Sequence, residues 1–338
     1  MNKSTAYLFP GQGAQYSGMS IDLLKCEEVK ALFYIASEVF GQDVKDILSS
    51  DAGTLKRTDI SQIAITTANL AAAEYLKCKG WSPAVCAGFS LGEYTALVCA
   101  GVICVDDCFR LVKARGLAMQ KVIDRLCDGR QLSKETVGSN DDEDTSTAPG
   151  MSVITGLAPE QIEELYNRMT EKGLKDVYIA NINSPKQIVL SGTADALTEA
   201  EKNFKDAGAK RAVRLPMAGP FHSPLMADAV KDFFPVLETI NFRDPVIPIF
   251  SNVTGKKISS GEEAKKLTLL HITHPVLWLE IEAAVAKTGI EVCFEAGPGN
   301  VLSGLWKNSG SKIPVYSAGT AADIESLAAA LWISESSG

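Results

Sequence analysis

The sequence predicts an α/β protein in which a large domain is interrupted by a smaller one. Three observations lead to this fold class. Short apolar segments with strand character alternate with helical patterns at both ends of the chain. A strand, a glycine-bounded turn and a helix follow one another over residues 83–101. Residues 151–215 follow the order strand, helix, strand, strand, helix, strand, which is typical of a ferredoxin-like unit.

The composition limits the classes of function that the chain can have. Its 338 residues, 46% of them hydrophobic, can bury the core of one large domain or of a large and a small one. The net charge is −8 and no basic run is present, so we expect no nucleic-acid partner. The longest apolar stretch, residues 96–105, is too short to cross a bilayer, so we expect no membrane insertion. No signal or transit peptide is visible, so we expect the cytoplasm, or a plastid-like or mitochondrial matrix if a transit peptide has been removed.

Eight cysteines are spread along the chain without C-x-x-C pairs, and most lie in apolar patterns. In a chain of this length they predict buried thiols in a reducing compartment, not a disulfide framework or a zinc site. His271 and His274 form an H-x-x-H pattern, but no third ligand accompanies them, so we expect no metal. The cysteines are Cys26, Cys78, Cys86, Cys99, Cys104, Cys108, Cys127 and Cys293.

The first predicted strand, residues 6–9, ends in the glycine-rich turn P-G-Q-G-A-Q. Gly11 and Gly13 match the start of a G-x-G-x-x-G dinucleotide pattern, but Tyr16 stands at the third glycine position, which disfavours nucleotide binding. The turn is then either a tight glycine turn alone or a loop whose backbone N–H near Gln12 faces the functional cleft.

Three helical patterns follow, over residues 26–40, 43–48 and 58–79. The third is rich in alanine and leucine, and Gln62 falls in its first turns. A glutamine at such a position is usually a cap or solvated, so spacing alone gives it no role in binding.

The turn at residues 88–92, G-F-S-L-G, lies between a short apolar strand at 84–87 and a helix at 93–99 that stops at Gly101. A sharp strand-to-helix turn crowds the backbone, and glycines relieve that crowding. The turn would expose the Ser90 hydroxyl and direct the free N–H of Leu91 toward a developing oxyanion. A solvated serine in an ordinary turn is the alternative, but the flanking strand and helix favour the nucleophile elbow of an α/β-hydrolase-like fold.

The predicted helix at residues 107–126 carries a buried cation candidate. Arg115 falls in the middle of the apolar stripe of this helix. A buried arginine needs an anionic partner, which is either an internal acid or the carboxylate of a ligand. The stripe consists of Cys108, Leu111, Val112, Ala118, Met119 and Val122.

The middle of the chain contains an insertion and a small domain. Residues 128–150 are rich in Gly, Ser, Thr and acids, and we expect them to form a flexible insertion. The ferredoxin-like domain is expected over 151–215, so that 1–127 and 216–338 make the large domain. Its strands are expected at 151–155, 177–182, 187–191 and 211–215, and its helices at 159–173 and 194–207.

Only three histidines can serve Ser90 as a base, and His222 is the best placed in the sequence. It sits in a loop bounded by glycine and prolines, where the chain returns to the large domain. Later elements are expected as strands at 246–252, 291–295 and 313–317 and as helices through Trp278 and over 300–306.

Together these residues resemble the malonyl-CoA:acyl carrier protein transacylase family of type II fatty acid synthesis. The matching segments cover nearly the whole chain in family order. They are F-P-G-Q-G-A-Q (9–15), S-Q-I-A-I (61–65), G-F-S-L-G-E-Y-T-A-L-V-C-A-G (88–101), R-G-x-A-M-Q (115–120), N-I-N-S-P-x-Q (181–187), F-H-S-P-L-M (221–226), H-P-V-x-W (274–278) and E-A-G-P-G (295–299).

The resemblance implies a two-step acyl transfer. Ser90 would attack the thioester of malonyl-CoA while His222 takes its proton, and acyl carrier protein would then remove the malonyl group. Malonyl-CoA is thus a substrate, no cofactor is implied, and we expect a monomer.

The resemblance also assigns supporting roles. The backbone N–H groups of Gln12 and Leu91 would form the oxyanion hole. Arg115, with Gln62 alongside, would bind the malonyl carboxylate. The main-chain carbonyl of His271, where relatives often carry glutamine, would orient His222.

Two departures and three alternatives stay open. Phe89 stands where many relatives have histidine, and the segment 128–150 is longer than usual. A free-standing polyketide acyltransferase shares all of these features. A serine esterase shares the turn but has no use for Arg115, and a non-catalytic binding protein has no use for Ser90, His222 and Arg115 together.

Overall fold

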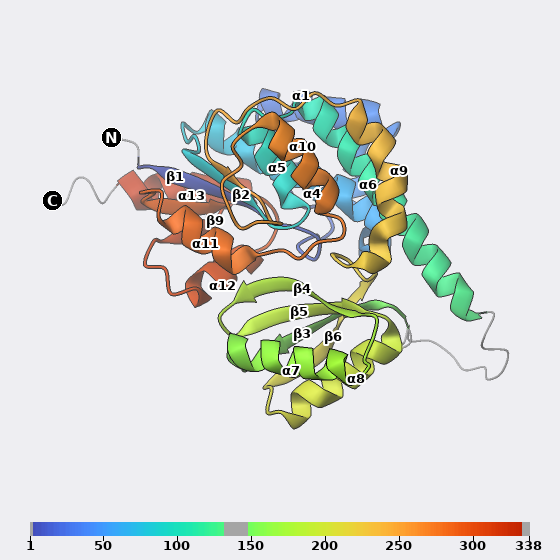
Figure 1. Cartoon of the computed structure of the whole chain (residues 1–338). Coiled ribbons are helices and arrows are strands. Elements are labelled where there is room, and N and C mark those ends of the chain that lie inside the picture. The colour runs from blue at the N-terminus through green and yellow to red at the C-terminus, as the bar shows by residue number, and fades with distance from the viewer. Residues whose placement is uncertain (1–2, 132–147, 333–338) are drawn as a thin grey trace.

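The computed structural model describes residues 3–131 and 148–332 and contains two sheets (Figure 1). The larger sheet has five parallel strands in the order β7-β2-β1-β8-β9. These strands are β1 (Thr5–Phe9), β2 (Val85–Gly88), β7 (Ile249–Phe250), β8 (Val292–Glu295) and β9 (Val315–Ser317).

Helices cover both faces of the larger sheet, because the side chains of each strand alternate between two apolar clusters. In β1, Tyr7 and Phe9 pack into the main cluster beneath α4, α5 and α6. Ala6 and Leu8 point the other way, into a smaller cluster with Trp278 of α11. The helices are α1 (Glu27–Phe40), α2 (Val44–Leu48), α3 (Ala52–Lys56), α4 (Thr58–Cys78), α5 (Gly92–Cys99), α6 (Val105–Gln131), α7 (Pro159–Glu171), α8 (Ala194–Asp206), α9 (Ala227–Glu238), α10 (Gly261–Leu270), α11 (Trp278–Ala286), α12 (Val301–Asn308) and α13 (Ala321–Trp332).

The smaller sheet is antiparallel, with strand order β4-β5-β3-β6. This is the ferredoxin-like order that the sequence predicts. Helices α7 and α8 cover its outer face, and its inner face turns toward the larger sheet (Figure 1). Met151 and Val189 of the inner face join the main apolar cluster. The strands are β3 (Gly150–Thr155), β4 (Val177–Ser184), β5 (Gln187–Gly192) and β6 (Arg211–Ala218).

Two expectations about element bounds are wrong. The strand expected at 246–252 is reduced to Ile249–Phe250 at the edge of the sheet, directly after Pro248, which has no N–H to donate. Helix α6 continues to Gln131, past the expected start of a flexible insertion at 128. Its exposed side is held by ion pairs to α9, one of which joins Arg125 to Asp228 at 2.6 Å. Residues 132–147 of the expected insertion lie outside the described residues. Its expected last residue, Gly150, is already the first residue of β3.

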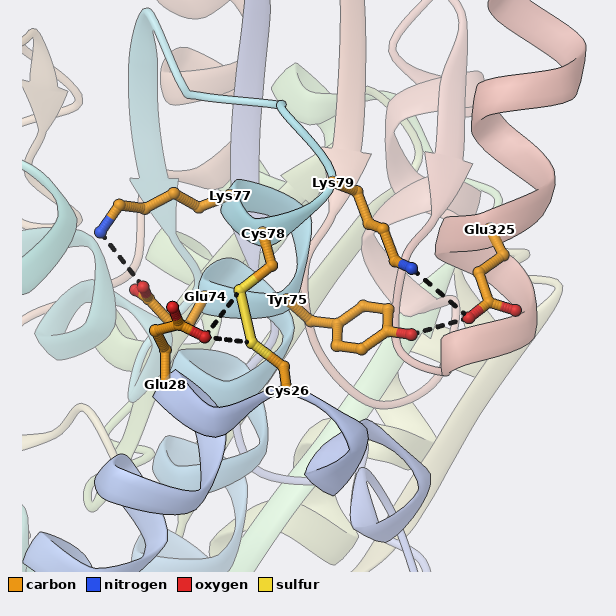
Figure 2. The surroundings of a disulfide bond; sticks show 8 residues. All are labelled: Cys26, Glu28, Glu74, Tyr75, Lys77, Cys78, Lys79 and Glu325. Atoms are coloured by element: carbon orange, nitrogen blue, oxygen red, sulfur yellow. Dashed lines mark hydrogen bonds and ion pairs between the residues drawn. A yellow bond between two sulfur atoms is a disulfide. The ribbon is translucent and has the colours of Figure 1, made fainter.

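The expectation of buried thiols outside any disulfide is wrong at two of the eight cysteines, Cys26 and Cys78. Cys26, at the start of α1, is bonded to Cys78, at the end of α4 (Figure 2). The two cysteines are 52 positions apart, and only the packing of α1 on α4 brings them together. Cys86, Cys108 and Cys293 are free and buried, as expected.

None of the helices in the described part of the chain is both long and apolar enough to span a bilayer.

The Cys26–Cys78 bond generates a stability prediction. It closes a long loop and should restrict the unfolded chain, so Cys78→Ser should lower the free energy of unfolding by about 2–4 kcal/mol. Urea denaturation without reductant measures this loss, and Cys104→Ser, an exposed free cysteine, is the matched control. If reductant leaves the unfolding midpoint of the unmodified protein unchanged, the bond contributes nothing.

Candidate active site

The site is built on the turn between β2 and α5, where the backbone is unusually crowded. A β-carbon on Gly88 would overlap the backbone of Gly92, and one on Gly92 would overlap the carbonyl of Phe9. Only glycine fits at either position. Between them, Ser90 adopts a left-handed conformation with φ of 49°, which non-glycine residues rarely take. This is the strained geometry of a nucleophile elbow.

The second residue of the pair comes from the loop after β6. His222 Nε2 lies 2.7 Å from the Ser90 hydroxyl oxygen. On the other side of the ring, Nδ1–H donates to the carbonyl of His271 at 3.0 Å and to that of His274 at 3.2 Å. Two acceptors at Nδ1 place the proton there, so Nε2 is free to accept the hydroxyl proton of Ser90.

The surroundings keep His222 neutral. Burial and, to a smaller extent, the positive charge of Arg115 lower the pKa of His222 to about 3, against the opposing effect of the two carbonyls. A neutral imidazole is the form that can act as a general base.

Arg115 reaches the same site from α6 and is only 2% exposed. Its guanidinium lies over the ring of Tyr94, 5.5 Å from the ring centre, and its Nε has no hydrogen-bond partner among the described residues. No carboxylate of the described chain forms a salt bridge with it, although the buried Glu93 acts on it at longer range. Burial lowers the pKa of Arg115, against the opposing effects of Tyr94 and Glu93. Of the two possible partners of Arg115, an internal acid is therefore not in contact with it among the described residues.

These side chains line one cleft between the larger sheet and the inner face of the smaller one. Its volume is about 330 Å³. Phe89 and Phe221 contribute apolar wall, and polar side chains also line the cleft, a mixture typical of pockets for small ligands. Ser90, His222, Arg115 and Gln12 line the cleft from the large sheet side, and Met151, Asn181 and Val189 from the small sheet.

The glycine turn after β1 lies against this elbow. A β-carbon on Gly11 would overlap the carbonyl of Phe89, so only glycine allows the two turns to approach so closely. The side chain of Gln12 donates to Thr58 at 3.4 Å, which helps to fix the turn. The backbone N–H groups of Gln12 and Leu91 donate no hydrogen bond within the described chain. They are therefore available to a ligand.

Two predicted site residues do not line the cleft. Gln62 is fully buried, and its amide donates to the sulfur of Met119, 3.4 Å away, a residue that does line the cleft. His271 is buried and contacts His222 twice, through its carbonyl at Nδ1 and through its own ring, whose centre lies 5.2 Å from that of His222. The contact of His222 with the second carbonyl, that of His274, was not predicted. The sequence signal that could have indicated it is the spacing of three residues between His271 and His274.

The fold and the site define an acyl transferase. The family model described as "Acyl transferase domain" matches residues 6–175 of the chain.

Named relatives identify the branch of this class. The malonyl CoA-acyl carrier protein transacylase of Bacillus subtilis strain 168 is 34% identical over 304 residues, which is 89% of each chain. The crystal structure of an acyl carrier protein S-malonyltransferase from Vibrio cholerae superimposes with a TM-score of 0.83 at 33% identity, over 96% of this chain and 99% of that one. A type II polyketide acyl carrier protein has been solved in complex with its malonyl-transacylase, which also matches at a TM-score of 0.83 and 33% identity, over 96% and 98%. The chain belongs to the malonyl CoA-acyl carrier protein transacylase family.

The buried His222 generates a prediction about protonation. Its imidazole should stay neutral from about pH 7.5 down to about pH 5, as measured by nitrogen chemical shifts in NMR, with His222→Gln used for assignment. The unfolded chain binds this proton below a pKa of about 6.5. The free energy of unfolding should therefore decrease as the pH falls from about 6.5 toward 3, and less so in His222→Gln. Titration of His222 near pH 6.5 in the folded protein would contradict this.

Proposed function

We propose that this chain transfers the malonyl group of malonyl-CoA to the phosphopantetheine thiol of acyl carrier protein, as an acyl-carrier-protein S-malonyltransferase. The observation that carries the proposal is the meeting of Ser90, His222 and an unpaired buried Arg115 in one cleft. A hydroxyl with a neutral base can form an acyl ester, and a desolvated guanidinium can select an acyl group that ends in a carboxylate.

The first half-reaction begins when the Ser90 oxygen attacks the thioester carbonyl and its proton passes to His222 Nε2. The N–H groups of Gln12 and Leu91 stabilise the oxyanion of the tetrahedral intermediate. The carbon–sulfur bond then breaks, the leaving thiolate of coenzyme A takes the proton from His222, and malonyl-Ser90 remains. The second half-reaction reverses these steps with the carrier-protein thiol as the nucleophile.

The two carbonyls at Nδ1 take the place of the acid in a catalytic triad. Those of His271 and His274 fix the ring and stabilise the imidazolium that forms during transfer. Arg115 would hold the malonyl carboxylate, which supplies the anion that the buried cation lacks. Gln62 contacts Met119, which lines the cleft, and does not line the cleft itself, so its proposed contact with the substrate has no direct support in the structure.

Several features bear on the wider assignment. Acyl carrier protein as the partner is supported by the complex of a related transacylase with its carrier. A plain esterase is disfavoured because it has no use for the buried Arg115.

Fatty acid synthesis is the proposed pathway, and polyketide synthesis is the alternative. The buried free cysteines Cys86, Cys108 and Cys293 support a reducing compartment, either the cytoplasm or an organelle matrix, although the Cys26–Cys78 bond does not. A monomer remains the expectation.

The nucleophile assignment is tested by intact-mass analysis after mixing with malonyl-CoA. The unmodified protein should gain one malonyl group on Ser90, and acyl carrier protein should remove it faster than water does. Ser90→Ala should form no adduct and lose about 10⁴-fold or more in turnover. An adduct that persists in Ser90→Ala would place the nucleophile elsewhere.

The carboxylate assignment is tested by comparing two acyl groups. Arg115→Ala should weaken transition-state binding of malonyl-CoA by about 2–5 kcal/mol, measured as kcat/KM, because the carboxylate then has no cation. Transfer from acetyl-CoA should be unchanged or improved. Arg110→Ala, on the exposed side of the same helix, is the matched control. Equal losses for malonyl and acetyl groups would rule out a carboxylate contact.

A further inference from the structure

A buried asparagine holds both sides of the strained serine. Asn252, two positions after β7, is fully buried. Its Oδ1 accepts the backbone N–H of Ser90 at 2.7 Å, and its Nδ2 donates to the carbonyl of Gly88 at 2.6 Å. One side-chain amide therefore bridges the end of β2 and the residue with positive φ.

The asparagine is itself held from two directions. Its backbone N–H donates to Glu93 Oε2 at 2.6 Å, and its carbonyl accepts the N–H of Leu277 at 2.9 Å. Glu93 lies in the first turn of α5 and is 2% exposed, so this bond is shielded from water. The elbow, the helix that follows it and the end of β7 form one hydrogen-bonded unit.

The hydrogen bonds of Asn252 hold Ser90 in a backbone conformation with positive φ. A non-glycine residue persists in the left-handed region only where its surroundings fix it. The side-chain amide of Asn252 satisfies two backbone groups that would otherwise be buried without partners at the end of the strand. It also occupies the N–H of Ser90, so an oxyanion must use the N–H groups of Leu91 and Gln12 instead.

We infer that Asn252, held by Glu93, is a positioning residue that fixes the backbone of Ser90 so that its hydroxyl meets His222. The inference rests on the proposed function, in which Ser90 is the nucleophile. Asn252 does not line the cleft, so it acts through Ser90 and not on the substrate. Its loss should slow formation of malonyl-Ser90 without weakening the binding of malonyl-CoA.

The test is the pre-steady-state release of coenzyme A from malonyl-CoA by the full chain. Asn252→Ala should lower the acylation rate by about 10²-fold, with KM changed by no more than about twofold, since a small misplacement of a reacting group has this effect. Asn252→Asp keeps the acceptor for the Ser90 N–H but loses the donor to Gly88. Its acylation rate should therefore fall between those of the unmodified protein and Asn252→Ala. The rate at which a fluorophosphonate labels Ser90 should decrease in the same order, from the unmodified protein through Asn252→Asp to Asn252→Ala.

A matched control separates positioning from general destabilisation. Leu327→Ala removes a buried side chain of α13, outside the cleft, and should lower the melting temperature while the acylation rate of the folded protein stays normal. Glu93→Gln can still accept from the Asn252 N–H and should retain more activity than Glu93→Ala. If Asn252→Ala does not fold, Asn252→Asp decides the question by the same two measurements.

The outcomes distinguish a failure of the proposed function from a failure of the positioning role of Asn252. If the unmodified protein forms no malonyl-Ser90, the proposed function fails and the inference fails with it. If the unmodified protein is acylated and the Asn252 variants react as fast as Leu327→Ala, the inference alone is overturned. A loss that appears entirely in KM would also overturn it, because positioning of Ser90 affects the chemical step.

Discussion

The backbone conformation of Ser90 is the constraint on which the rest of the site depends. Glycines at 88 and 92 allow β2 and α5 to meet at a turn that no larger residue permits. The side chain of Asn252 satisfies the backbone on both sides of the serine. The hydroxyl is thereby held within 2.7 Å of His222, on a segment 132 positions away in the sequence. A small rotation at this turn would separate the pair.

Desolvation gives the buried groups their chemical properties. Away from water, the pKa of His222 is lowered, so the ring stays neutral beside a permanent cation. Burial also raises the pKa of Glu93 to about 7, although its bond to Asn252 favours the ionised form. Arg115 has no carboxylate in contact among the described residues, which is costly for a buried charge, and the proposed substrate carboxylate would relieve that cost. In the proposed function, the same burial that makes the base available also makes the site selective for acyl groups that end in a carboxylate.

The cleft exists because two sheets of different construction face one another. The parallel sheet supplies the elbow at the carboxyl end of β2, which is where ligands bind in open α/β sheets. The antiparallel sheet supplies an apolar wall through Met151 and Val189 and, at the end of β6, leads into the loop that carries His222. The small subdomain is therefore part of the site, because it closes one side and delivers the base.

The sequence by itself determined the α/β class, the ferredoxin-like order and the elbow, since each depends on local patterns of glycine and apolar residues. It also singled out His222 by scarcity and Arg115 by its place in an apolar stripe. Only the tertiary structure decided what these groups contact: the second carbonyl from His274, the contact of Gln62 with Met119, the two hydrogen bonds from Asn252 and the Cys26–Cys78 bond. The physical reason is that backbone carbonyls, buried amides and distant thiols leave no periodic trace in a sequence. Their partners are chosen by the packing of remote segments.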